Sequence, residues 1–142
     1  MLFNEVANEG ALRVPQDESR ADAIVVDAFS GDSIPIHLIT TQAADLYRSR
    51  LADNGLLLFH ISNRTLDLKP IVLGLAQHLG WGSALFVSYN YETTGETAST
   101  WAPLTANREF LRRIDTKTTQ WPSTTPIQWS DDYASMWHVL KF

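Results

Sequence analysis

The stretch Ala23-Ile24-Val25-Val26-Asp27 is a short apolar run, rich in β-branched side chains, that ends in a carboxylate. A continuous run of this kind is typical of a strand buried on both faces of a parallel sheet. Similar runs follow at residues 56–62 and 83–89, and residues 99–104 give a fourth candidate strand. These runs indicate the strand content of an α/β domain.

Helical periodicity separates the first three of these strands. The stretch Thr41–Ala52 places its apolar side chains on one face, with a threonine to cap its start and Asn54-Gly55 to end it. Residues 67–79 form a second helix, which Gly80 closes. A short helix is predicted at 107–114, a further helix is favoured at 132–140, and residues 116–129 are irregular. The order βαβαβ predicts a mostly parallel sheet with helices packed on it, and leaves room for one antiparallel edge strand.

Length and composition limit the classes of protein that fit. The chain has 142 residues, 44% of them hydrophobic and 19% charged, which is typical of one globular domain. We divide it into an N-terminal arm at 1–22 and a domain at 23–142. The net charge of −5, without a basic patch, argues against nucleic-acid binding.

The absence of cysteine excludes disulfides, thiolate zinc sites and thiol catalysis, and fits a cytoplasmic protein. No apolar stretch approaches 18 residues, so we expect no membrane span. The N-terminal residues lack the basic and apolar regions of a signal peptide.

Candidate functional residues lie where the predicted strands end, because ligands of open α/β sheets bind beyond the carboxyl ends of the strands. Asp27 and Asp32 bound one such loop and could hold both ends of a small cation. The alternative is that they only cap backbone N–H groups. The second loop carries His60, Ser62 and Asn63.

The histidines have different interpretations. His60 lies inside an apolar strand and is interpreted as a core histidine rather than a base, whereas His37 in the first loop is a candidate for substrate binding. His78 fits a helix C-terminus. No spacing of ligands supports a metal site, so none is predicted. The five tryptophans, all between residues 81 and 137, are interpreted as core or interface residues.

Two other kinds of site are disfavoured. A Ser-His-Asp hydrolase lacks the expected G-x-S-x-G elbow. Gly80-Trp81-Gly82 is the only G-x-G, and it follows a helix and precedes a strand, the reverse of a dinucleotide-binding turn.

Three segments carry a resemblance to a known family. They are IVVDAFSGDSIPIHLIT at 24–40, HISNR at 60–64 with the LDL of 66–68, and WSDDY at 129–133. Together they resemble the spermidine synthase-like family, and in particular its bacterial branch, in which the domain is sometimes fused to a membrane transporter-like region. The resemblance runs from about residue 20 to the C-terminus.

The resemblance implies the fold of S-adenosylmethionine-dependent methyltransferases, a Rossmann-like three-layer sandwich. It also implies aminopropyl transfer from decarboxylated S-adenosylmethionine to putrescine, with release of methylthioadenosine. Asp27 would orient the attacking amine and take its proton, and Asp32 would help to bind the diamine. His37, Ser62 and Asn63 are expected to contact the substrate.

Two departures from the family pattern modify this expectation. The family has Asp-Ser-Ser-Asp-Pro here, whereas in this chain the second aspartate, Asp32, follows Asp27 by five residues. The family's glycine-rich turn and ribose-binding acidic residue would precede residue 1, so we expect the chain alone to bind no nucleotide cofactor and to be inactive.

A homodimer, or association with a missing half-domain, is therefore expected. Polyamines or other small cations are the expected ligands. The alternatives are a non-catalytic interaction or assembly module derived from the fold, and a different small-molecule transferase on the same scaffold.

Overall fold

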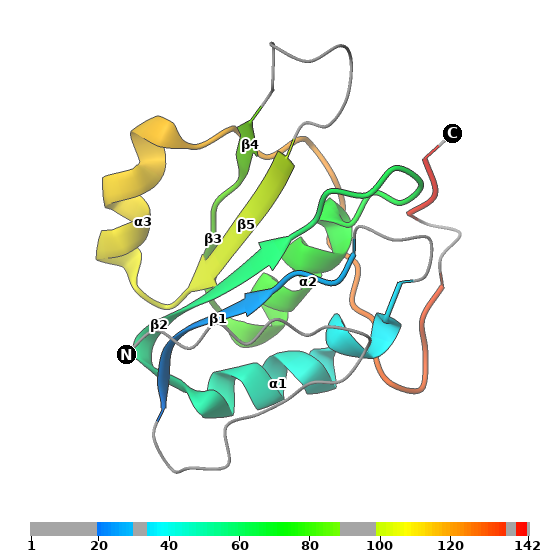
Figure 1. Ribbon diagram of the computed structural model, residues 1–142, viewed down its shortest axis with the longest axis horizontal. Helices are drawn as coiled ribbons and strands as arrows, with labels where there is room; N and C mark the ends of the chain where they lie inside the picture. Colours follow the sequence, from blue (N-terminus) through cyan, green and yellow to red (C-terminus); the bar gives the residue numbers. More distant parts are fainter. Residues whose placement is uncertain (1–19, 30–33, 89–98, 136–138, 142) are drawn as a thin grey trace.

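The computed structural model describes residues 20–29, 34–88, 99–135 and 139–141 (Figure 1). Its strands are β1 (Ala21–Val26), β2 (Leu51–His60), β3 (Gly82–Ser83), β4 (Phe86–Ser88) and β5 (Ser99–Thr105). Its helices are α1 (Thr41–Arg50), α2 (Lys69–Leu79) and α3 (Arg108–Ile114), with the 3₁₀ turns η1 (Ile36–Leu38) and η2 (Asp115–Lys117). No described helix has the length and apolar character that a bilayer crossing requires.

The five strands form one mixed sheet in the order β1-β2-β5-β3, with β4 also paired to β5. β1 and β2 are parallel, whereas β5 is antiparallel to β2, β3 and β4. It follows that β1, β2, β3 and β4 all point the same way, and that β5 is inserted among them in the opposite direction.

The prediction of a mostly parallel sheet is therefore wrong. Among the described strands, only the β1–β2 pair is parallel, and the antiparallel strand lies inside the sheet rather than at its edge. Only residues 89–98 join β4 to β5. A crossover between parallel neighbours needs about a dozen residues or more, so this connection favours an antiparallel pair.

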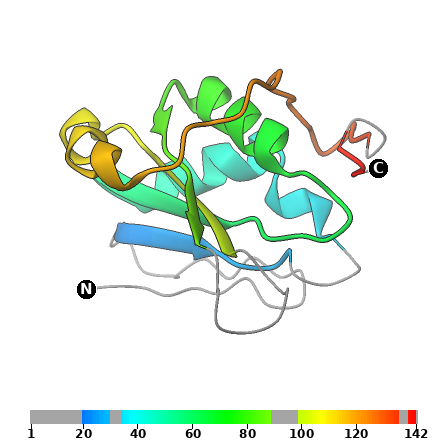
Figure 2. The same cartoon turned by 90° about the horizontal axis from the view of Figure 1, so that it is seen from above.

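The hydrophobic core lies between one face of the sheet and the helices α1 and α2 (Figure 2). Leu57 and Phe59 of β2 and Leu104 of β5 point to this face and are fully buried. The apolar side of α2 packs over them through Ile71 and Leu75. This burial holds the ends of β1 and β2 in fixed positions, because close-packed interiors allow little displacement.

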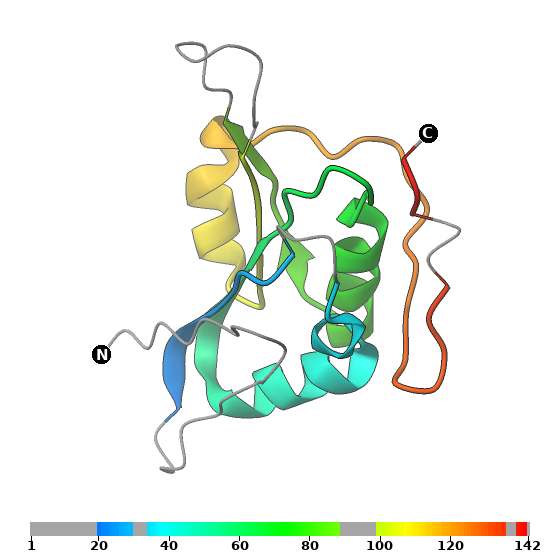
Figure 3. The same cartoon turned by 45° about the vertical axis from the view of Figure 1, so that its right-hand side comes forward.

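The third helix, α3, lies on the opposite side of the sheet, beside β3 (Figure 3). Gly82 pairs with Thr105, whose neighbour Leu104 faces the core, so Gly82 faces away from the core. A Cβ added to Gly82 would lie 2.3 Å from Cδ1 of Leu111 in α3. Helices thus lie on both sides of the sheet, which confirms the α/β class, while the Rossmann-like assignment stays a proposal.

The ends of the helices follow the predicted signals with one exception. The Thr40 hydroxyl accepts the Ala43 N–H and caps α1, and Gly80 ends α2 at φ 68°. The predicted end of α1 at Asn54-Gly55 is wrong, because Leu51 already belongs to β2. Asn54 instead has φ 61° inside β2, close to the register shift between β1 and β2.

Two further elements differ from the prediction. The strand expected at 83–89 is divided into β3 and β4, with Ala84 and Leu85 between them. The helix favoured at 132–140 is wrong in the described residues, because Leu140 forms an antiparallel bridge with Leu66. Most of the predicted N-terminal arm, residues 1–19, lies outside the described residues.

The C-terminal segment 118–135, here called the strap, runs along the side of α2 that faces away from the sheet (Figure 3). The Ile127 N–H donates to the Pro70 carbonyl at 2.9 Å, and the Thr41 N–H donates to the Trp129 carbonyl at 2.8 Å. Trp129 is 1% exposed, which confirms its interpretation as a core residue. The strap therefore completes the core on the outer side of α1 and α2.

Candidate functional site

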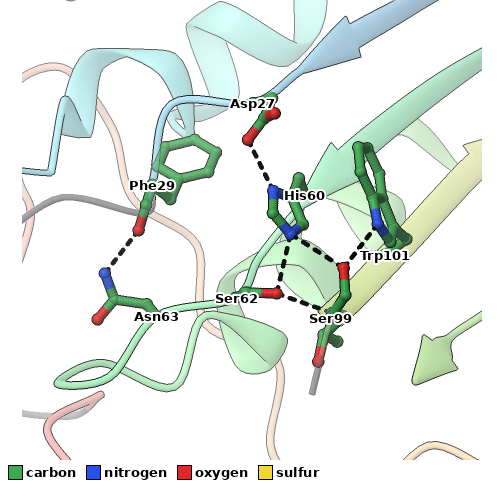
Figure 4. Close-up of polar contacts among 8 residues, drawn as sticks. Asp27, Phe29, His60, Ser62, Asn63, Ser99 and Trp101 are labelled. Carbon is green, nitrogen blue, oxygen red and sulfur yellow. Dashed lines mark hydrogen bonds and ion pairs between the residues drawn. The ribbon is translucent and has the colours of Figure 1, made fainter. Parts of the chain in front are cut away.

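Two polar side chains meet where the parallel strands β1 and β2 end (Figure 4). Val26 pairs with Phe59, so the next residues along the two strands, Asp27 and His60, are neighbours. His60 Nδ1 lies 2.7 Å from Asp27 Oδ1. The side chains are 37% exposed for Asp27 and 19% exposed for His60, so solvent reaches the carboxylate while the imidazole is largely covered.

The second ring nitrogen of His60 faces two hydroxyl groups. Nε2 lies 2.9 Å from Ser62 Oγ and 3.2 Å from Ser99 Oγ. Each hydroxyl oxygen also accepts an N–H bond, from Thr100 N at 2.8 Å for Ser62 and from Trp101 Nε1 at 2.9 Å for Ser99. His60 thus connects a carboxylate in the loop after β1 to hydroxyls in the loop after β2 and on β5.

The imidazole is also held by stacking. His60 and Trp101 are paired across β2 and β5, and their rings are stacked at 4.4 Å with an interplanar angle of 18°. A ring fixed on one face by an indole and at both nitrogens by polar partners has little freedom to rotate.

Asn63 joins the two loops that carry the site. Its side-chain NH₂ donates to the Phe29 carbonyl at 2.7 Å, in the loop after β1. Its side-chain oxygen accepts the N–H groups of Thr65 at 2.9 Å and Leu66 at 2.8 Å, in the loop after β2. Because Phe29 is fully buried, this bridge fixes the loops that follow Asp27 and His60 relative to each other.

The structure brings together some of the predicted site residues. Asp27 and Ser62 belong to one hydrogen-bonded network through His60, and Asn63 lies in the adjoining loop. His37 is an exposed residue of η1, and its predicted contact with substrate stays a prediction. Asp32 lies outside the described residues.

Sequence reasoning missed three contributors, His60, Ser99 and Trp101. The signal for His60 was present, since it ends a strand parallel to the one that Asp27 follows, and side chains at such ends meet at one edge of the sheet. Ser99 and Trp101 gave no such signal, because their proximity depends on β5 pairing beside β2 rather than at the far edge.

The arrangement can hold a cation and move a proton. A carboxylate accepts hydrogen bonds from ammonium groups, and an imidazole can give or take a proton near neutral pH. Within the described residues, no group of three or more potential metal-ligating side chains occurs.

The fold and the site define a mixed α/β protein with a carboxylate–imidazole–hydroxyl network at the ends of two parallel strands. No protein-family model and no curated protein matches the chain.

Proposed function

We propose that the chain binds a small aliphatic amine at Asp27 and provides the amine-acceptor side of a spermidine synthase-like aminopropyltransferase. The observation that carries this proposal is the state of the Asp27 carboxylate. Its Oδ1 is held by His60, while its other oxygen has no hydrogen bond to any described residue, and the side chain is 37% exposed. A fixed, half-exposed anion at the end of a strand is suited to an ammonium ligand.

The chemistry of aminopropyl transfer requires such a group. A protonated amine has no free electron pair, so the site must orient the amine and accept its proton before the nitrogen can attack. The attack forms a bond to the aminopropyl carbon next to the sulfonium sulfur, and the carbon–sulfur bond breaks as methylthioadenosine leaves. In the spermidine synthase-like family, which the sequence resembles, the donor of the aminopropyl group is decarboxylated S-adenosylmethionine. We assign only the acceptor side to the described site, because the sequence shows no strand followed by a G-x-G turn.

Calorimetric titration with putrescine tests this function. We expect saturable binding to the wild-type chain and binding at least about tenfold weaker for Asp27→Asn, since a charge-assisted hydrogen bond contributes about 1.5–3 kcal/mol. Asp45→Asn is the matched control, because Asp45 also pairs with a histidine, His78 Nε2 at 3.0 Å, but on the helices. Absence of binding to the wild-type chain, or equal weakening by the two variants, would contradict the proposal.

A second candidate function is the assembly module. It is favoured by the position of β1, which pairs with β2 alone among the described strands and so forms one edge of the sheet. Saturable putrescine binding that depends on Asp27 separates the two candidates, and titration with decarboxylated S-adenosylmethionine and with methylthioadenosine is a further test of the assembly module. Tight binding of either ligand would exclude a purely structural role.

A further inference from the structure

The hydrogen-bond partners of His60 determine which of its nitrogens carries the proton. An ionised carboxylate can only accept hydrogen bonds, so the 2.7 Å contact with Asp27 Oδ1 requires a proton on Nδ1. In the neutral ring the proton is then absent from Nε2, which becomes an acceptor.

The two serines suit an acceptor at Nε2. Thr100 N–H donates to Ser62 Oγ, and the Trp101 indole N–H donates to Ser99 Oγ, so both oxygens already accept a hydrogen bond. Their hydroxyl protons are free to point at His60, at 2.9 Å from Ser62 and 3.2 Å from Ser99. Donation therefore runs from the serines to Nε2, and from Nδ1 to Asp27.

Protonation of Nε2 would change the charge of the whole site. With a neutral imidazole, the Asp27–His60 pair carries one negative charge, which is available to an ammonium group. With an imidazolium, the pair is neutral, and a cationic ligand gains less from contact with the carboxylate. Among the described residues, Asp27 is the one titratable group hydrogen-bonded to His60, while its other partners Ser62, Ser99 and Trp101 carry no charge.

We infer that His60 is the positioning residue of the amine site and that it regulates the site by protonation. It holds Asp27 Oδ1 and leaves the second carboxylate oxygen for the ligand, and its neutral Nδ1–H tautomer is the form that binds the amine. A proton on Nε2 and an ammonium ligand then compete for the same carboxylate charge. This inference rests on the proposed function, since it concerns the amine that Asp27 binds.

Nitrogen NMR of the full chain tests the tautomer without any ligand. At about pH 8 we expect the His60 ring to show a protonated Nδ1 and an unprotonated Nε2. The signals are assigned by their loss in His60→Asn. A proton on Nε2 and none on Nδ1 would overturn the inference, because Nδ1 could not then donate to Asp27.

The pH dependence of putrescine binding tests the competition. Histidine is the side chain that ordinarily changes its charge between about pH 5 and pH 8, so acidification over this range tests the effect of a proton on Nε2. We expect the dissociation constant of the wild-type chain to rise about tenfold from about pH 8 to about pH 5.5, because the charge-assisted contact of the ammonium group with Asp27 is weakened. In His60→Asn, whose amide keeps an N–H near the position of Nδ1, the rise should stay below about threefold.

His78→Asn is the control, because His78 forms the comparable pair with Asp45 on the helices. Its dissociation constant should rise with falling pH as in the wild-type chain. An equal rise in His60→Asn would show that His60 has only a structural role and would overturn the inference while leaving amine binding intact. Absence of putrescine binding to the wild-type chain at every pH would instead overturn the proposed function, and the tautomer measurement still tests the ring.

Discussion

At the scale of single residues, Tyr47 shows how one polar atom is accommodated in the core. The residue is 1% exposed, and its hydroxyl donates to the Leu38 carbonyl at 2.8 Å. Its ring meets Phe59 edge-on, at a centroid distance of 6.2 Å. Burial raises the pKa of Tyr47 well above its ordinary value, because the phenolate would lose its hydration.

Tyr47→Phe tests this hydrogen bond. At neutral pH the variant should be less stable by about 1–2 kcal/mol, because the buried Leu38 carbonyl loses its partner. Above about pH 10 the unfolded chain ionises at Tyr47 while the folded chain does not, so alkaline pH lowers the stability of the wild type. The gap between the two proteins should therefore narrow as pH rises. Urea unfolding at about pH 7, 9 and 10.5 measures it, and a constant gap would contradict the assignment.

The candidate site was predictable from the sequence in part. Asp27 could be identified because an apolar strand ends there, and a strand end fixes the place of the next side chain. His60 was interpreted as a core residue, although its place at the end of a strand parallel to β1 pointed to Asp27 as a neighbour. That neighbour is set by the register between β1 and β2, which depends on packing of both strands against the helices.

At the scale of secondary-structure elements, the contact of α2 with the strap depends on the absence of a side chain. A Cβ added to Gly74 would lie 2.0 Å from the Ile127 carbonyl oxygen. The same part of the strap is hydrogen-bonded to α2 through Ile127 N–H and the Pro70 carbonyl. The backbone of the strap therefore cannot stay in place if residue 74 gains a methyl group.

Gly74→Ala should destabilise the protein by about 1–3 kcal/mol, although alanine favours a helix interior by about 1 kcal/mol over glycine. Limited proteolysis should also cut the strap faster than in the wild type. Gly80→Ala is the control, since nothing lies within 4 Å of the added Cβ and only the left-handed backbone, at φ 68°, is strained. Faster cleavage in both variants alike would indicate general destabilisation rather than displacement of the strap.

The directions of the strands were easier to predict from the sequence than their order in the sheet. The apolar runs correctly gave β1 and β2, and the helices between the strands gave their common direction. Local pattern did not reveal that β5 enters between β2 and β3, because sheet order is decided by which edges can be covered after the chain folds. The strap was unpredictable for a related reason, since the hydrogen bond of Ile127 N–H to the Pro70 carbonyl joins backbone groups that no side-chain pattern reports.

At the scale of the whole molecule, the candidate site lies beside one edge of the sheet. Asp27 follows β1, which pairs on one side with β2 and has no other β-partner among the described residues. Ala23 and Val25 of this strand are partly exposed. A strand edge with unpaired N–H and C=O groups tends to pair with another strand.

We expect this edge to pair with β1 of a second copy around a two-fold axis, because a two-fold axis brings identical patches together. Sedimentation velocity at micromolar concentration should then show a dimer. Val25→Lys should shift it to monomer, since the axis would place two like charges in one interface, whereas Leu46→Lys, on the exposed part of α1, should not. A monomeric wild-type chain would exclude the dimer. Resistance to hydrogen exchange at those β1 amides that do not donate to β2 would then show that a segment of the same chain covers the edge.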